Sequence, residues 1–214
     1  MQKISIENTL PCVFAGRDDD SSEVWLQNIT FERGKSYLIT AESGTGKSSL
    51  CSYIYGFRSD YTGNIVFDGE DIRNFPVLRW CEIRSRNIAY LPQELRLFPE
   101  LTALENVQLK NRLTNFKSPK EINSLFEQLG IAEHLASEVG RMSIGQQQRV
   151  AIIRTLCQPC DFMLLDEPVS HLDATNNRIV GNLITEEAYK QGAAIISTSV
   201  GNNILIKVDK ELKL

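Results

Sequence analysis

Residues 41–48, Ala-Glu-Ser-Gly-Thr-Gly-Lys-Ser, have the types and spacing of a loop that holds phosphate groups. They follow the strand-like run of residues 37–40 and lead into residues 49–51, which we expect to open a helix. In such a loop the glycines let several backbone N–H groups point at one place, and the helix contributes its positive end. The lysine supplies a point charge for the outer phosphates, and the serine after it supplies an oxygen for magnesium. The residues predicted to surround the phosphates are Ala41, Glu42, Ser43, Gly44, Thr45, Gly46, Lys47, Ser48 and Ser49.

Two carboxylates follow a second apolar run. Asp166 and Glu167 come directly after residues 162–165, Phe-Met-Leu-Leu, which places them at the C-terminal end of a buried strand. A core strand ordinarily avoids charge there, unless a metal ion and a reactive water stand beside it. We therefore interpret Asp166 as holding the water shell of a magnesium ion, and Glu167 as orienting or deprotonating the attacking water. The alternative interpretation is an acidic cap at the end of the strand.

A serine and a glycine occur where another helix is expected to begin. Residues 142–149 read Met-Ser-Ile-Gly-Gln-Gln-Gln-Arg and precede a segment with helical periodicity. Because the N-terminus of a helix presents unpaired N–H groups, it attracts anions. We interpret Ser143, Gly145 and Gln146 as a second phosphate-binding element, so that one chain would contain two.

Composition limits the class of protein. The chain has 214 residues, enough for one sizeable α/β domain with its own core. Lys and Arg total 23 against 27 Asp and Glu, and the formal charge of −4 gives no general attraction to nucleic acid or anionic lipid. No apolar run approaches the ~18 residues that span a bilayer, and the first residues lack the regions of a signal peptide. We therefore expect a cytoplasmic location.

The five cysteines do not form the pattern of a disulfide framework, because their number is odd and their spacing irregular. Cys157 and Cys160 are a single CxxC pair with no histidine at ligand spacing. We interpret them as two apolar thiols near a buried strand rather than as a redox or zinc site.

The periodicity of the chain predicts an α/β fold. The first 40 residues alternate in the manner of an antiparallel β leaf, whereas residues 102–130 have helical spacing. Strands separated by helices predict a mainly parallel sheet with helices on both faces and ligand chemistry at the strand ends. Further strands are expected at residues 63–67, 88–91, 162–165, 193–196 and 204–208.

These motifs resemble, in the same order and over nearly the whole chain, those of the ATP-binding cassette (ABC) family. Residues 142–149 resemble the family's signature, usually Leu-Ser-Gly-Gly-Gln, and residues 91–93 resemble its glutamine loop. Residues 170–173 resemble the loop after the Walker B strand, through which two active sites communicate. The resemblance implies a P-loop NTPase core in a single domain, 1–214. Residues 1–87 and 147–214 would form the nucleotide-binding core and residues 88–146 an inserted helical subdomain.

The resemblance also implies cofactors and partners. ATP and Mg²⁺ would be bound. Ser48, Gln93 and Asp166 would hold the metal, and Glu167 and Gln93 would have catalytic roles. Phe14, or else Trp25, would stack on the adenine. The signature of one cassette would close over the nucleotide of another in a head-to-tail dimer, either with itself or with a different cassette. A separate membrane permease would be the partner, at the inner face of the cell membrane, and nucleic acid would not be one.

Three residues depart from the family pattern. Ala41 replaces the first glycine of the phosphate loop, which is tolerable where φ is negative. Ile144 stands where the signature usually has glycine, and its β-branched side chain should crowd or tilt the loop that receives the γ-phosphate. Val200 replaces the histidine of the switch loop, and valine can neither donate a hydrogen bond to the γ-phosphate nor hold the attacking water. We therefore predict nucleotide binding with slow hydrolysis.

Three functional hypotheses follow. The chain is an energy-coupling ATPase subunit, a regulatory subunit that binds ATP and scarcely hydrolyses it, or a soluble DNA-associated ATPase with a related head. Residues 95–107 resemble small bacterial cassettes of the lipoprotein-releasing, macrolide-exporting and cell-division types. The acidic balance and the lack of a coiled-coil pattern count against the third hypothesis.

Overall fold

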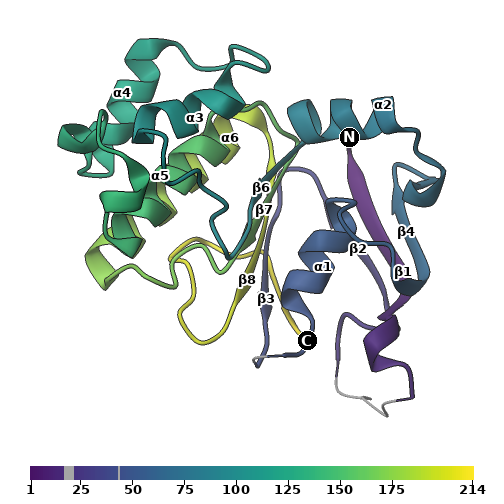
Figure 1. Ribbon diagram of the computed structural model, residues 1–214. Helices are drawn as coiled ribbons and strands as arrows, with labels where there is room; N and C mark the ends of the chain where they lie inside the picture. Colours follow the sequence, from purple (N-terminus) through teal and green to yellow (C-terminus); the bar gives the residue numbers. More distant parts are fainter. Residues whose placement is uncertain (17–21, 43) are drawn as a thin grey trace.

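A parallel sheet of five strands carries the phosphate loop and the two carboxylates (Figure 1). The computed structural model describes residues 1–16, 22–42 and 44–214. In this sheet the strand order is β6-β7-β8-β3-β9, and every pairing is parallel. The strands are β3 (Ser36–Thr40), β6 (Ile88–Leu91), β7 (Phe162–Asp166), β8 (Ala194–Ser199) and β9 (Lys210–Lys213). The central strands are buried on both faces, as the near-continuous apolar runs predict.

A second sheet is antiparallel and has the order β2-β1-β4-β5. In β1 the buried residues Ile4 and Ile6 alternate with more exposed ones, and Ile4 pairs with Phe31 on one side and Phe67 on the other. This alternation is the period-2 pattern of a sheet with one face in the core. The predicted antiparallel leaf is therefore confirmed for β1 and β2, whereas residues 36–40 of the predicted range form β3 of the parallel sheet. Its strands are β1 (Lys3–Pro11), β2 (Asn28–Glu32), β4 (Tyr61–Phe67) and β5 (Glu70–Asp71).

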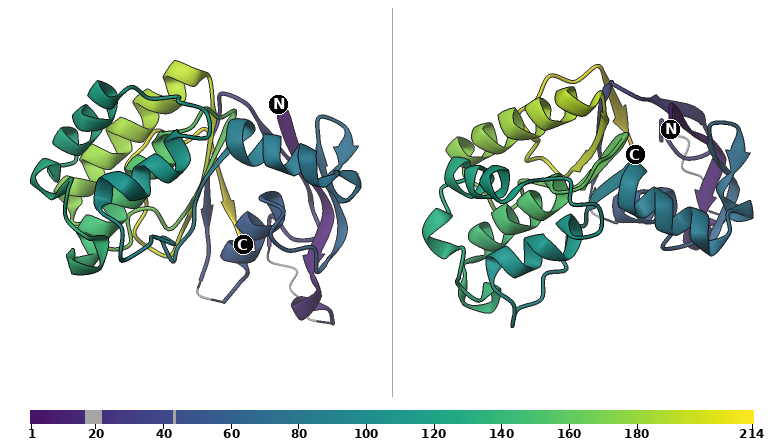
Figure 2. Two further views of the ribbon diagram at one scale, coloured as in Figure 1. Left: turned by 45° about the horizontal axis from the view of Figure 1, so that its top comes forward. Right: turned by 90° about the horizontal axis from the view of Figure 1, so that it is seen from above.

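Helices cover both faces of the parallel sheet. α1 lies between the two sheets, while α3 to α6 form a layer on the opposite face (Figures 1 and 2). Along β7, Phe162 and Leu164 pack in the cluster on the α1 side, whereas Met163 and Leu165 pack in the cluster on the α5 side. The α-helices are α1 (Lys47–Ile54), α2 (Val77–Glu82), α3 (Ala103–Asn111), α4 (Pro119–Gln128), α5 (Ile144–Leu156) and α6 (Ala174–Gln191). Short 3₁₀ helices span Cys12–Phe14, Ile72–Asn74, Ala132–His134 and Val139–Arg141, and a π-helical turn spans Ile83–Asn87.

The helices of the predicted insert begin at residues that cap them. Thr102 and Ser118 each accept a hydrogen bond from the backbone of a glutamate three positions later, Glu105 and Glu121, whose side chain bonds back to the capping residue. Such capping boxes satisfy N–H groups that have no partner within the helix. The predicted boundary of the inserted subdomain, residue 88, coincides with the start of β6, which is hydrogen-bonded to β7 in the parallel sheet. The division into core and helical subdomain otherwise stays a prediction.

The prediction of a strand at residues 204–208 is wrong. The backbone N–H of Ile206 donates to the carbonyl of Ile204, and that of Leu205 donates to Asn177 Oδ1 in α6. These local and side-chain bonds use the groups that a sheet would need, so the segment is irregular. The last strand is β9, which adds to β3 a few residues later.

Candidate functional site

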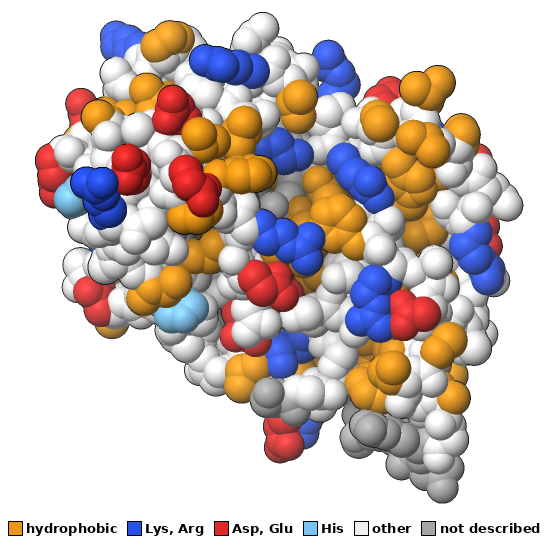
Figure 3. Space-filling model, in the orientation of Figure 1, with side chains coloured by type: hydrophobic (Ala, Val, Ile, Leu, Met, Phe, Trp, Pro, Cys, Tyr) orange, Lys and Arg blue, Asp and Glu red, His pale blue; other side chains and the backbone are white. Residues whose placement is uncertain are grey.

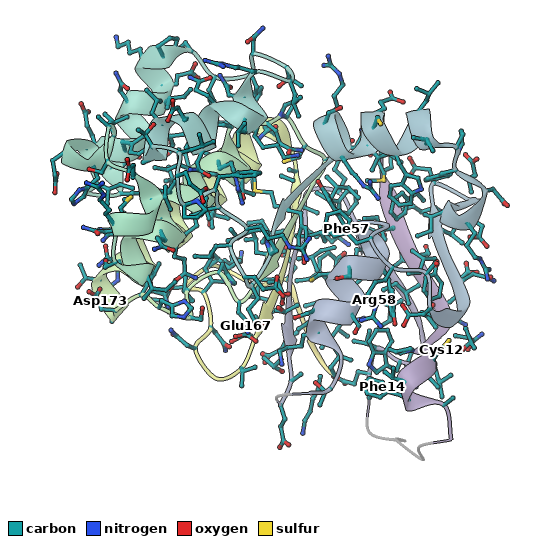
Figure 4. The ribbon with its side chains drawn as sticks, in the orientation of Figure 1. Cys12, Phe14, Phe57, Arg58, Glu167 and Asp173 are labelled. Carbon is teal, nitrogen blue, oxygen red and sulfur yellow. The ribbon has the colours of Figure 1, made fainter. Side chains whose placement is uncertain are left out.

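One cavity of about 300 Å³ joins residues from several distant parts of the sequence. They come from the 3₁₀ helix near the N-terminus, the loop after β3, the start of α1, the loop after β6 and the end of β7. Figure 4 shows Phe14 and Glu167 on either side of the start of α1. The lining residues are Val13, Phe14, Gly44, Gly46, Lys47, Ser48, Ser49, Gln93 and Glu167.

The loop after β3 has the backbone that the glycine pattern predicts. Gly44 and Gly46 have φ of +84° and +102°, in the region that side chains disfavour. A Cβ on Gly46 would also lie 2.9 Å from the Phe14 ring and 3.1 Å from the Trp25 ring, so no larger residue fits. Ala41 is not among the described residues with positive φ, which explains why alanine can replace the usual glycine. Ser43 lies outside the described residues.

Lys47 and Glu42 connect the two ends of this loop. Lys47 Nζ donates to the carbonyl oxygen of Glu42 at 2.9 Å, and Thr45 Oγ1 donates to the same oxygen at 2.9 Å. The Lys47 side chain is only 5% exposed, so its charge acts in a setting of low dielectric where attraction to an anion is strengthened. The loop can therefore present a cation and backbone N–H groups to a phosphate.

Oxygen donors gather beside the lysine. Ser48 Oγ donates to Gln93 Oε1 at 3.3 Å, although the two residues are 45 positions apart. Asp166 is 1% exposed, and its burial raises the pKa of the carboxyl, an effect that the Thr198 hydroxyl partly offsets. Within the described ranges no group of three or more His, Cys, Asp and Glu side chains could hold a metal. A hydroxyl, an amide and one carboxylate do fit Mg²⁺, which takes few protein oxygens and completes its shell with water and phosphate.

Glu167 adopts an unusual backbone at the end of β7. Its φ is +51°, in the left-handed region that a non-glycine residue occupies at a cost and mostly at functional sites. Its backbone N–H donates to Thr198 Oγ1 at 3.3 Å, and its carbonyl accepts from Gln148 Nε2 at 3.3 Å. The turn places Glu167 in the lining of the cavity, so its predicted role as a general base has the required access.

The two aromatic candidates differ in position. Phe14 lines the cavity, whereas Trp25 does not and is 4% exposed. Trp25 Nε1 donates to the carbonyl oxygen of Thr45 at 3.1 Å, so the indole supports the phosphate loop from the core side. The geometry therefore favours Phe14 as the aromatic that a planar base would meet, and its role in stacking stays a prediction.

The second anion element lies at the start of α5. Ser143 caps the helix, and Gln146 Oε1 accepts from the Ser143 backbone N–H at 2.8 Å in a capping box. Gln146 Nε2 lies 2.8 Å from His134 Nε2, and a Cβ on Gly145 would lie 3.1 Å from the carbonyl oxygen of His171. Ser143, Gly145 and Gln146 do not line the cavity that holds Lys47. The two predicted phosphate-binding elements therefore do not share one cavity in a single chain.

Comparison with known proteins decides the family. A family model described as ABC transporter matches residues 26–170. The chain belongs to the ABC transporter family. Its function is that of an ATP-binding subunit, and the fold, recognised from the sequence as that of an ABC cassette, is confirmed.

Individual relatives agree with this assignment. The lipoprotein-releasing system ATP-binding protein LolD of Shewanella denitrificans is 31% identical over 193 residues, which cover 87% of this chain and 82% of LolD. The uncharacterized ABC transporter ATP-binding protein YclH of Bacillus subtilis is 30% identical over 191 residues, covering 87% and 83%. Among solved structures, the dimeric bacterial cassette MJ0796 superposes with a TM-score of 0.80 at 23% identity, covering 98% of this chain and 94% of that one.

In the cassette, a buried glutamine that the sequence analysis missed joins the signature helix to the Walker B turn. Gln148 is 1% exposed, and its Nε2 donates to the carbonyl oxygen of Pro168 at 2.7 Å. Its Oε1 accepts from the backbone N–H of His171 at 3.0 Å. The available signal was a polar residue between apolar ones on a helix, which indicates a buried polar contact but not its partner.

The two residues that depart from the family pattern in the signature and the switch loop are exposed to solvent. The side chains of Ile144 and Val200 are 50% and 43% exposed, at the start of α5 and after β8. Neither lines the cavity. The effect of Ile144 and Val200 on hydrolysis therefore stays a prediction.

The CxxC pair lies in the core, between α5 and β7. Cys157 and Cys160 are free and buried, and burial raises the pKa of each thiol to about 12. The expected burial of the two thiols is confirmed, and the absence of a redox or zinc role stays a prediction. None of the helices in the described part of the chain is long and apolar enough to cross a membrane.

Proposed function

We propose that this cassette binds ATP together with Mg²⁺ in the cavity between Phe14 and Glu167 and hydrolyses the ATP slowly. The observation that carries the proposal is the convergence of Lys47, Ser48, Gln93 and Glu167 on one cavity. All four come from loops at the C-terminal ends of β6 and β7 or from the helix that follows β3, where ligands of parallel sheets bind.

Each residue has a role in this proposal. The phosphate loop and Lys47 bind the outer phosphates, and Phe14 stacks on the base. Ser48, Gln93 and Asp166 would hold Mg²⁺, which when bound neutralises charge on the phosphate oxygens. Glu167, its carboxylate turned into the cavity, orients the water and accepts its proton.

Slow hydrolysis follows from Val200. A hydrogen bond from a histidine to the γ-phosphate or the water has no counterpart in a valine side chain. If that contact contributes about 3 kcal/mol to the transition state, its loss slows turnover by roughly a hundredfold. Because Glu167 is retained, we expect some activity. The second candidate, a hydrolysis-deficient regulatory subunit paired with a more complete cassette, is favoured by Val200 and Ile144 together.

Partners complete the proposal. Since Ser143 and Gly145 lie away from the cavity of their own chain, a second cassette placed head to tail would bring its signature over the nucleotide. The MJ0796 cassette was solved as a dimer, and LolD is named as part of a lipoprotein-releasing system. We propose that this chain likewise works at the inner face of the membrane with a separate permease, which selects the substrate, and without nucleic acid.

The experiment that tests the proposal measures steady-state ATP hydrolysis by the purified chain beside Glu167→Gln. Nucleotide binding and dimerisation are followed in the same samples. Turnover that the substitution abolishes while binding persists supports an ATPase subunit. Binding without turnover above the Glu167→Gln variant, alone and with the permease, supports the regulatory candidate. Absence of ATP binding rejects both.

A further inference from the structure

A buried hydroxyl stands beside the two carboxylates, on the neighbouring strand. β8 packs Ala194 and Ile196 in the cluster on the α1 side, and the next residue in this alternation is Thr198. The register of β7 and β8 pairs Asp166 with Thr198. Thr198 is completely buried. Valine has the same shape and suits a buried strand better, so the hydroxyl needs a specific reason.

The hydroxyl bonds to both members of the acidic pair. Thr198 Oγ1 donates to Asp166 Oδ1 at 2.6 Å and accepts from the backbone N–H of Glu167 at 3.3 Å. One proton and two lone pairs allow both bonds at once. The bond to a carboxylate is short, as expected when the acceptor is charged.

These two bonds act on different properties of the site. The first fixes the side-chain rotamer of Asp166 and leaves its other oxygen for the metal's water shell. The second holds the backbone of Glu167, whose φ of +51° persists only where the surroundings maintain it. Ser197 provides a contrast on the same strand, because it is equally buried and its hydroxyl has no hydrogen-bond partner.

We propose that Thr198 is a positioning residue that sets Asp166 for Mg²⁺ and Glu167 for the attacking water. The inference rests on the proposed function. It also gives the switch strand β8 a polar connection to both carboxylates in a chain whose switch loop carries Val200 in place of histidine. Thr198 itself does not line the cavity and acts through its two neighbours.

Three variants of the full chain test the proposal. Thr198→Val removes the hydroxyl and keeps the shape, Thr198→Ser keeps the hydroxyl, and Ser197→Ala removes a neighbouring hydroxyl that has no partner. Each is titrated with a fluorescent ATP analogue in excess EDTA and then with Mg²⁺. Electron paramagnetic resonance measures the binding of Mn²⁺ to the nucleotide complex, and circular dichroism checks the fold.

We expect Thr198→Val to raise two quantities by about tenfold: the Mg²⁺ concentration that gives half of the maximal change in fluorescence, and the Kd for Mn²⁺. A change of this size corresponds to the loss of one charge-assisted hydrogen bond. Nucleotide affinity in EDTA should stay within about twofold of the unaltered chain. Thr198→Ser and Ser197→Ala should both retain the original metal dependence. Hydrolysis at saturating Mg²⁺ should also fall in Thr198→Val, since the backbone of Glu167 loses its acceptor.

Several results would overturn the proposal. One is an unchanged metal dependence in Thr198→Val, and another is an equal change in Thr198→Ser. A third is an equal loss of nucleotide affinity with and without metal, which would indicate a structural role alone. Should the valine variant not fold, Thr198→Cys, a residue of similar size and weaker donor strength, takes its place. If the unaltered chain binds no ATP analogue, the proposed function fails and this inference fails with it.

Discussion

Lys47 Nζ lies 3.9 Å from Glu167 Oε1, so the cation of the phosphate loop and the carboxylate at the end of β7 face each other in one cavity. Their side chains are only 5% and 16% exposed. Because neither charge is fully hydrated, each is stabilised by the opposite charge of the other. An arriving phosphate is attracted by the lysine and repelled by the glutamate, and divalent metal reduces that repulsion.

This relationship predicts that Lys47→Ala weakens ATP binding more than it weakens the fold. Removal of a charged hydrogen-bond donor costs about 2–3 kcal/mol of binding free energy, or roughly 30- to 150-fold in Kd. Titration with a fluorescent ATP analogue measures the loss. The matched control is Lys35→Ala, a lysine at the opposite end of β3 that pairs with Glu32 at the surface. An equal loss of affinity in the control would contradict the assignment of Lys47.

Val200 predicts a gain of function. Its side chain is 43% exposed in the loop after β8, so Val200→His has room and should cost little stability. If the missing histidine limits hydrolysis, the variant should turn over ATP at least tenfold faster, with Kd for ATP changed less than threefold. Val200→Ala controls for a simple change of bulk. Equal rates of hydrolysis in Val200→His and the unaltered chain would mean that a residue other than Val200 limits hydrolysis, and Ile144 would be the next position to test.

Much of this site could be predicted because its chemistry is local in sequence. The phosphate loop is one continuous segment, and Asp166 and Glu167 directly follow the strand that positions them. Gln93 follows β6 in the same way, and the parallel pairing of β6, β7, β8 and β3 then brings the loops together. Periodicity was therefore sufficient for the fold class, and the local motifs for the phosphate loop and the two carboxylates, whereas Gln93 and Phe14 were predicted from the resemblance to the ABC family.

The rest depended on pairings between distant segments, which no local pattern contains. The bond from Thr198 to Asp166 needs the register of β7 and β8, and the bonds of Gln148 need the packing of α5 on the Walker B turn. Residues 204–208 were apolar enough for a strand, but Asn177 in α6 accepts from the backbone N–H of Leu205, and the N–H of Ile206 donates to the carbonyl of Ile204. The sequence already favoured Phe14 over Trp25, but the hydrogen bond from the Trp25 indole to the carbonyl of Thr45 needs the packing of segments 20 residues apart.

Gln148 predicts a stability effect that is independent of nucleotide. Gln148→Met keeps the volume but leaves the N–H of His171 and the carbonyl of Pro168 without their partner inside the protein. Unpaired buried polar groups cost about 1–3 kcal/mol each, so we expect the free energy of unfolding to fall by about 2–4 kcal/mol. Urea denaturation followed by circular dichroism measures it. Gln128→Met, an exposed position on α4, should change it by less than about 0.5 kcal/mol.

Lys110 makes stability depend on pH in the alkaline range. It lines a hollow of about 210 Å³ together with Arg96, Arg154 and aromatic rings, and Figure 3 shows basic and apolar side chains gathered there. Burial, and then the charges of Arg154 and Arg84, lower the pKa of Lys110 from 10.5 to about 8. Its ammonium donates to the carbonyl oxygen of Arg84. The folded state therefore carries a lysine that loses its proton more readily than in the unfolded chain.

The sign of the effect follows from proton binding. Between pH 8 and 10.5 the unfolded chain binds more protons at this lysine than the folded chain does, so this group's contribution to stability rises with pH. Below pH 8 both states are protonated, and burial of the charge is a constant cost. Because the side chain is partly exposed, water screens the charge, and we expect that cost to be about 1–2 kcal/mol rather than the full value of the shift.

Lys110→Met should therefore raise the free energy of unfolding near pH 7 by about 1–2 kcal/mol, with the difference from the unaltered chain shrinking as pH rises from 8 toward 10.5. Urea denaturation at several pH values measures that difference. This difference excludes other buried groups whose effect on stability has the opposite dependence on pH. Tyr61 is one such group, because burial raises its pKa to about 12. Lys120→Met, at an exposed position on α4, should show no such trend. A difference that is constant from pH 7 to 10.5 would mean that the Lys110 ammonium is as well solvated as in the unfolded chain.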